Sequence, residues 1–231
     1  MIVAVHQPQY LPWLGYFDKM DRADLFVLLD TVQFKKNEWQ NRNRIKTAQG
    51  WQWLTVPVAY RFPQRINQVE INPRINWARK HLLAMRINYS KAPYFSDYFD
   101  SFEKILSENW QGIAALNLRL VRALTELLGI STPLRLASEL GNLPEGPDER
   151  LIAICQHLGA AVYLAGMGGK DYMNLEKFDK AGIEVVFQEF KHPVYPQLYG
   201  EFLPNLSVVD LLFNCGKQSL RIIREAQKEE Q

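Results

Sequence analysis

Ile-Val-Ala-Val-His at residues 2–6 and Gln-Pro-Gln-Tyr-Leu-Pro-Trp-Leu-Gly-Tyr-Phe at residues 7–17 decide the fold. The first segment is short, apolar and β-branched, and two prolines follow it, so we predict a buried strand and then a turn. A short helix leads to Leu-Phe-Val-Leu-Leu at residues 25–29, whose unbroken apolar character is typical of a parallel strand covered on both faces. These segments predict a β-turn-α-β unit with a right-handed crossover.

The second half of the chain alternates strands with helices. We expect strands at residues 133–138, 161–165 and 183–187, a helix that starts at Asp148 and stops at Gly159, and a helix that ends near Gly182. Alternation of this kind indicates a parallel doubly wound sheet. The predicted fold class is therefore α/β.

Residues 77–130 change to the apolar periodicity of helices, with Gly129 as a stop signal. We therefore predict a single α/β domain over residues 1–231 with a helical insertion at 77–130. Residues 51–58 alternate like a strand, and another short strand is expected near residues 69–71. A final helix is expected to begin at Ser207 with a capping box and to run to the terminus.

Composition limits the class of protein. Hydrophobic residues make up 47% and charged residues 23%, and the apolar runs are too short to cross a bilayer. The N-terminus lacks the features of a secretory signal, so we expect a cytoplasmic protein without membrane insertion. Cys155 and Cys215 have no metal-ligand spacing and are expected to be buried free thiols. The net charge of +2 argues against nucleic acid as the partner.

Ligands of open α/β sheets bind beyond the carboxyl ends of the strands, and the turn after the first strand is the first candidate site. It carries an imidazole, amides and aromatic rings on a loop that its prolines would hold rigid. The alternative is a stiff loop with core aromatics, in which the histidine is a satisfied core residue. The candidate residues here are His6, Gln7, Gln9, Tyr10, Trp13 and Tyr16.

The stretch at residues 30–44 is the second candidate site. Its cations, amides and indole suit an anionic ligand with a planar part, such as a nucleotide or nucleotide-sugar, because arginine binds phosphate in a fork and indole stacks. A solvated basic loop is the alternative. The candidate residues are Gln33, Trp39, Asn41, Arg42 and Arg44.

The glycine-rich turn at residues 165–172 is the third candidate site. Its backbone N–H groups would hold phosphate or carboxylate at a helix N-terminus, although the spacing is not that of a Walker loop. The candidate residues are Gly168, Gly169, Lys170, Asp171 and Tyr172, followed further along the chain by His192, Tyr195, Asp210 and Asn214. The four histidines lack metal-ligand spacing, so no metal site is predicted.

Together these segments resemble the WbqC-like protein family. The residues that carry the resemblance lie at 6–17, 30–34, 39–45, 54–57, 91–95 and 206–216, so it spans nearly the whole chain. Members of that family look connected with bacterial surface-polysaccharide gene clusters, and a glycine transferase role has been suggested for them. The resemblance implies an enzyme that joins an amino acid to an amino sugar through an amide.

A weaker similarity links the chain to nucleotidylyltransferase-like folds and to pantothenate synthetases. Residues 12–16 are similar to the His-x-Gly-His turn of the former, while residues 169–172 and 33–34 have counterparts in the latter. This similarity implies a nucleotidylyltransferase-like sheet and ATP with Mg²⁺ to activate a carboxylate. Trp13 and Tyr16 replace both histidines of the turn, so phosphoryl charge would have to be stabilised by other residues. The candidates for that role are His6, Arg42, Arg44 and Lys170.

The expected function is an amide-forming transferase or ligase that attaches a small carboxylate, for example glycine, to an amino sugar or nucleotide-sugar. In this hypothesis Trp39 stacks on a base or sugar and His6 is the general base. Lys170 is grouped with Asp171 as catalytic, and Lys170 would bind phosphate with Arg42 or Arg44. The alternatives are a non-catalytic module that binds a nucleotide-sugar or a partner protein, and transfer from an acyl-thioester or charged tRNA without ATP.

Overall fold

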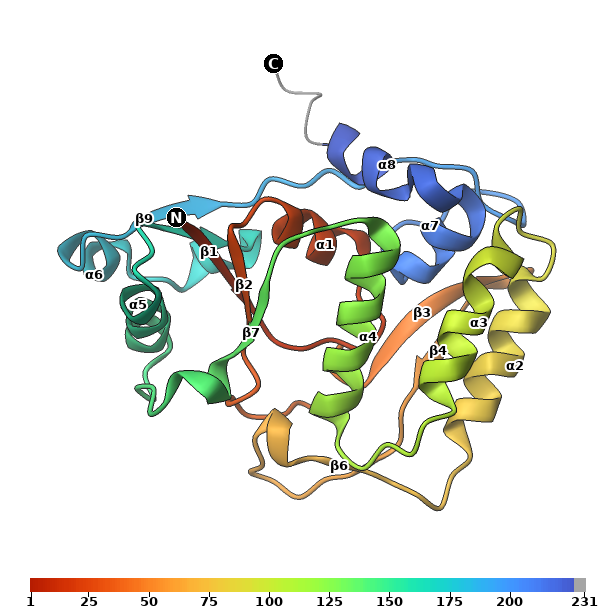
Figure 1. Cartoon of the computed structure of the whole chain (residues 1–231), viewed down its shortest axis with the longest axis horizontal. Coiled ribbons are helices and arrows are strands. Elements are labelled where there is room, and N and C mark those ends of the chain that lie inside the picture. The colour runs from red at the N-terminus through yellow and green to blue at the C-terminus, as the bar shows by residue number, and fades with distance from the viewer. Residues whose placement is uncertain (227–231) are drawn as a thin grey trace.

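A computed structural model describes residues 1–226, and its centre is a five-stranded parallel sheet (Figure 1). The strands are β1 (Ile2–His6), β2 (Leu25–Leu28), β7 (Leu134–Leu136), β8 (Val162–Ala165) and β9 (Glu184–Phe187). Their spatial order is β7-β2-β1-β8-β9, so the chain winds outward from β1 in one direction and restarts on its other side. The predicted parallel doubly wound sheet is confirmed, and its topological switch point lies between β1 and β8.

The two faces of the sheet belong to different hydrophobic cores, which explains the unbroken apolar runs in its strands. Ala4 and Phe26 pack into one core, whereas Val3, Val5 and Val27 pack into the other. Successive side chains of a strand point to opposite faces, so both faces of β1 need apolar residues.

Helices cover both faces of the sheet. In chain order they are α1 (Leu14–Asp21), α2 (Trp77–Tyr89), α3 (Phe95–Leu106), α4 (Ile113–Leu128), α5 (Pro147–Leu158), α6 (Leu175–Lys180), α7 (Val208–Cys215) and α8 (Ser219–Glu225). In Figure 1, α5 and α6 lie on one side of β1 and β2, and α2, α3 and α4 lie on the other. Helices α2–α4 fall within the range predicted for the insertion. Gly129 and Gly159 end their helices with φ of 77° and 66°, as the stop signals predict.

A hairpin of β3 (Arg42–Thr47) and β4 (Gly50–Thr55) is the main element that the sequence analysis missed. The stretch before Lys46 was expected only as a basic segment, and a single strand was expected at 51–58. That strand divides at Pro57, which has no N–H to donate to a ladder. Beyond it β5 (Val58–Ala59) pairs with β6 (Glu70–Ile71), which is the short strand expected near 69–71.

The C-terminal helix is divided, contrary to the prediction of one helix. Ser207 caps α7 by accepting a hydrogen bond from the N–H of Val209 at 3.3 Å, but the carboxylate of Asp210 turns to other partners. The break is at Gly216, which has φ of 55° and where the Tyr94 ring leaves no room for a Cβ. The predicted continuation over residues 227–231 lies outside the described residues.

Cys155 and Cys215 are buried free thiols, as expected. Over residues 1–226, every helix is too short or too polar to span a bilayer.

Candidate functional site

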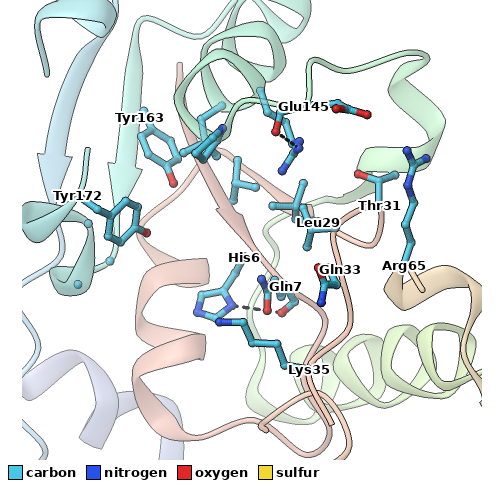
Figure 2. A pocket seen from close by; sticks show the side chains of 18 of the residues that line it. His6, Gln7, Leu29, Thr31, Gln33, Lys35, Arg65, Glu145, Tyr163 and Tyr172 are labelled. Carbon is cyan, nitrogen blue, oxygen red and sulfur yellow. Dashed lines mark hydrogen bonds between the residues drawn. The ribbon is translucent and has the colours of Figure 1, made fainter. Parts of the chain in front are cut away.

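A cavity of about 920 Å³ opens at the carboxyl ends of β1, β2 and β8. His6 and Gln7 come from the end of β1, Thr31 from the segment after β2, and Gly168 and Gly169 from the turn after β8. Figure 2 shows His6 and Gln7 near one end of this hollow, with aromatic side chains further round it. The cavity therefore occupies the switch point between β1 and β8, where sheets of this topology bind ligands. Its volume suits a ligand of nucleotide size.

His6 presents a neutral imidazole to the cavity. Its Nδ1 lies 3.2 Å from the carbonyl oxygen of Gln7. A carbonyl only accepts, so Nδ1 carries the hydrogen and Nε2 carries the lone pair. Burial, and then the charge of Lys19, lower the pKa of His6 to about 3. The ring is uncharged at neutral pH and can accept a proton or hydrogen bond at Nε2.

Lys19 lines the same cavity although its residue is only 2% exposed. It comes from α1, where its Nζ donates to the carbonyl oxygen of Val5 at 2.9 Å and lies 5.9 Å from the ring centroid of Tyr163. Burial lowers the pKa of Lys19 to about 7. An ammonium in such surroundings is stabilised by a nearby anion.

The outer wall of the cavity is predominantly cationic. Lys35, Arg65 and Arg150 line it, and Glu145 is the carboxylate among the lining residues. Arg150 donates from Nε to the carbonyl oxygen of Pro144 at 2.9 Å, which holds the guanidinium against the turn before α5. The excess of positive charge favours an anionic ligand.

The chain is similar to known proteins over nearly its whole length. The model of the WbqC-like protein family matches residues 7–222, a range that includes every segment of the cavity wall from Gln7 to Tyr172. The chain belongs to the WbqC-like protein family. A relative described as the uncharacterized protein Rv1507c, from Mycobacterium tuberculosis (strain ATCC 25618 / H37Rv), is 40% identical over 227 residues, which is 96% of this chain and 97% of the relative. No solved structure matches the chain.

In this WbqC-like chain, six of the predicted site residues line the cavity. They are His6, Gln7, Gln33, Gly168, Gly169 and Tyr172. They come from all three predicted segments, so the structure brings the ends of those segments together. Tyr172 is 70% exposed, which leaves its ring available at the cavity mouth.

The other candidate residues of the first turn are buried or partly buried and are not among the residues that line the cavity. Gln9 and Tyr10 are buried, and the Tyr10 hydroxyl lies 2.8 Å from Nδ1 of His81. Trp13 packs edge-on against Phe190. Tyr16 is buried behind His6, with ring centroids 4.8 Å apart. These aromatic side chains support the turn, which corresponds to the core alternative left open by the sequence.

The predicted aromatic and basic residues around Trp39 also lie outside the cavity lining. Arg42 lies 4.1 Å from the ring centroid of Trp53, and Arg44 lies 5.2 to 5.8 Å from those of Trp39, Trp51 and Trp53. Trp39 lies just before the β3–β4 hairpin and the other members of this cluster lie on it, with the two guanidinium groups placed over the indole rings. Asn41 is structural, since its Nδ2 donates to the carbonyl oxygen of Val56.

The remaining candidates lie apart from the cavity. Lys170 pairs with Glu189 at 3.9 Å, and neither Lys170 nor Asp171 is among the lining residues. His192, Tyr195, Asp210 and Asn214 belong to the segment around α7. The Asp210 carboxylate accepts hydrogen bonds from Tyr89, Tyr195 and Gln197 at 2.7 to 2.9 Å, and burial raises its pKa. The number of bonds to Asp210 indicates a structural network.

Sequence reasoning missed several of the lining residues, including Lys19, Arg65, Arg150 and Tyr163. The last three come from segments far apart in the chain, and no local pattern joins them. Lys19 left no local signal either, because it follows Asp18 in the last turn of α1, where a lysine is ordinary. Within residues 1–226, no three His, Cys, Asp or Glu side chains gather to hold a metal ion.

Proposed function

We propose that this chain binds a nucleotide or nucleotide-sugar in the cavity and forms an amide between a small carboxylate, such as glycine, and an amino group of the sugar. The reaction would serve surface-polysaccharide biosynthesis in the bacterial cytoplasm. The observation that carries the proposal is the joint presence of a neutral His6 and a buried Lys19 in a cavity with a cationic wall. Membership of the WbqC-like family supports the proposed pathway, because resemblance to that family implies a role in bacterial surface-polysaccharide biosynthesis.

In the proposed reaction, the amine that accepts the acyl group must lie next to a group that accepts its proton. The amine nitrogen attacks the acyl carbon, a C–N bond forms, and the bond from the acyl carbon to its leaving oxygen or sulfur breaks. The nitrogen then releases a proton, for which Nε2 of His6 is the acceptor in the cavity. Lys19 and the cations of the wall stabilise the negative charge of the donor or of the phosphates.

The carboxylate could be activated in either of two ways. In the first, ATP with Mg²⁺ is a co-substrate that supplies the activation, and Lys35, Arg65 and Arg150 provide charges that suit its phosphates. In the second, the acyl group arrives on a thioester or a tRNA. Trp13 packs against Phe190 and Tyr16 packs behind His6, so neither replaces a phosphate-binding histidine in the cavity. That packing supports the second version.

A second candidate function is a non-catalytic module that holds a nucleotide-sugar or a partner protein of the same pathway. The pKa of about 3 favours it, because an imidazole so reluctant to take a proton is a weak general base. The cavity and its cationic wall would serve binding equally well.

The test combines product detection with binding. Purified protein is incubated with glycine and a nucleotide amino-sugar, together with MgATP, an acyl-thioester or a charged tRNA in separate arms, and the amide is detected by mass spectrometry. The proposal expects product in one arm, loss of product with His6→Ala, and no change with Gln49→Ala on the exposed β3–β4 turn. Absence of product in every arm, with nucleotide-sugar binding in a thermal-shift assay, would instead identify the binding module.

A further inference from the structure

The described part of the chain holds two deeply buried lysines with contrasting surroundings. Lys46, 1% exposed, donates to Oε1 of Gln197 at 3.0 Å and to the carbonyl oxygen of Glu201 at 2.6 Å. Lys19, 2% exposed, donates to one group, the carbonyl oxygen of Val5. An ammonium carries three N–H donors, so Lys19 has unused capacity and Lys46 has little. Of these two lysines, Lys19 lines the cavity at the carboxyl ends of β1, β2 and β8.

The nearest carboxylate on the same helix is already engaged. Asp18 accepts a hydrogen bond from Nε2 of Gln188 at 2.6 Å, and its carboxylate lies 3.8 Å from Arg22. Burial lowers the pKa of Lys19, a shift that a close carboxylate would oppose. A buried charge without a counter-ion is costly unless a bound anion completes the site. Lys19 therefore has the surroundings of a ligand-binding group more than those of a structural one.

We infer that Lys19 is the anion-binding residue of the cavity, and that its ammonium pairs with the phosphoryl or carboxylate group of the bound ligand. The inference deepens the proposed function, because it rests on the cavity as the ligand site and names the group that takes the anionic end of the ligand. His6, which is neutral, lies next to it and leaves Lys19 as the positive charge at this point of the cavity.

The charge of Lys19 links binding to pH. The titratable groups that face it are His6 from β1 and Tyr163 from β8, with Asp18 beside it on α1 and with Arg150 and Glu145 on the same cavity wall. His6 and Tyr163 are neutral near pH 7, since burial lowers the pKa of the first and raises that of the second. The pKa of Lys19, about 7, will rise when an anion binds, so affinity falls as pH increases from about 6 to 8.

The experiment measures anion binding to the full-length protein by NMR of the lysine Cε and Nζ signals, with sulfate as the phosphoryl mimic and acetate as the carboxylate mimic. Neither probe titrates between pH 6 and 8, so a change in affinity reports on the protein. The Lys19 signal is assigned from its absence in Lys19→Met. We expect sulfate, acetate or both to raise the pKa of Lys19, and the probe that does so identifies the phosphoryl or carboxylate source.

Three variants separate binding from structure. Lys19→Met should lose roughly tenfold or more in affinity together with the pH dependence, and Lys19→Arg should keep the affinity but lose the pH dependence. Lys36→Met, an exposed lysine outside the lining, should match the wild type. Wild-type affinity and pH dependence in Lys19→Met, or no response of the Lys19 signal to millimolar sulfate and acetate, would overturn the inference. Anion binding through Lys19 without amide formation would overturn the reaction alone.

Discussion

Gln40 donates a hydrogen bond from Nε2 to Oε1 of Gln7 at 2.6 Å, and this contact fixes which end of the Gln7 amide faces the cavity. The orientation of Gln40 follows from its other bond, in which Oε1 accepts from the N–H of Lys35 at 2.8 Å. Gln40 must therefore present its NH₂ group to Gln7. Because Oε1 of Gln7 accepts this hydrogen bond, the NH₂ group of Gln7 can donate to a ligand.

The first prediction concerns this positioning role of Gln40. Gln40→Ala should weaken nucleotide-sugar binding about threefold to tenfold, because the Gln7 amide loses its anchor. Isothermal titration calorimetry measures the change, with Gln49→Ala as the control on an exposed turn. Equal affinities for the Gln40→Ala variant and the wild type would show that Gln7 is held by other means.

The second prediction contrasts the two buried lysines in stability. Lys19→Met should change the free energy of unfolding by less than about 1 kcal/mol, since removal of a poorly paired buried charge offsets the lost bond to Val5. Lys46→Met should cost about 1–3 kcal/mol, because it removes the donor for Gln197 and Glu201. Urea denaturation at pH 7 measures both values. The reverse order of the two costs would make Lys19 the structural residue.

A third prediction concerns acid stability and His81. Burial lowers the pKa of this imidazole to about 4, against 6.5 without burial. Between these two pH values the unfolded chain binds a proton that the folded chain does not, so the free energy of unfolding falls as pH falls from 6.5 to 4. The contribution is on the order of 3 kcal/mol.

The variant that tests this fall in the free energy of unfolding at acid pH is His81→Gln, which keeps an acceptor for the Tyr10 hydroxyl. The variant should lose less stability than the wild type over the same pH range in parallel denaturation curves. Identical slopes would mean that His81 does not take part in the acid transition.

The fourth prediction compares two exposed aromatic residues. Tyr172 is 70% exposed at the cavity, and Trp39, just before the β3–β4 hairpin, is 37% exposed with Arg44 beside its ring. If the nucleotide binds in the cavity, Tyr172→Ala should reduce its affinity about fivefold or more through lost stacking, and Trp39→Ala should leave it unchanged. Calorimetric titration with the same nucleotide-sugar gives both values. A loss of affinity in Trp39→Ala alone would indicate that the nucleotide binds beside the hairpin and not in the cavity.

The fold was predictable where the signal is local. The apolar strands at residues 2–6 and 161–165 and the stop at Gly159 are read from neighbouring residues, and the structure agrees with them to within a residue or two. Strand β3 was not predicted because one of its buried positions is the polar residue Asn43. That side chain donates to the carbonyl oxygen of Leu11 at 2.7 Å, and a buried amide does not look like a strand core in the sequence.

The sequence analysis named some of the residues that line the cavity and missed others. The rule that ligands bind beyond the carboxyl ends of the strands made His6 a candidate, and His6 lines the cavity. Trp39 and Arg44 have the chemistry of ligand-binding residues, yet they contact each other, and the sequence does not distinguish these two outcomes. Arg65 and Arg150 reach the cavity only through the tertiary fold.

The pairing of β1 has a mechanical consequence for the cavity. With β2, β1 pairs as far as His6, but with β8 it pairs only as far as Ala4. The carbonyl of His6 accepts from Leu29 on the β2 side, so the carbonyl of Val5 points the other way, where Lys19 meets it. The cavity thus lies where β1 and β8 separate, and the amine of Lys19 lies beside that point. Because β1 is already paired with β2 as far as His6, its backbone should be rigid before a ligand binds. We therefore expect ligand binding to slow amide hydrogen exchange in the cavity-lining segments that follow β2 and β8, and not in β1.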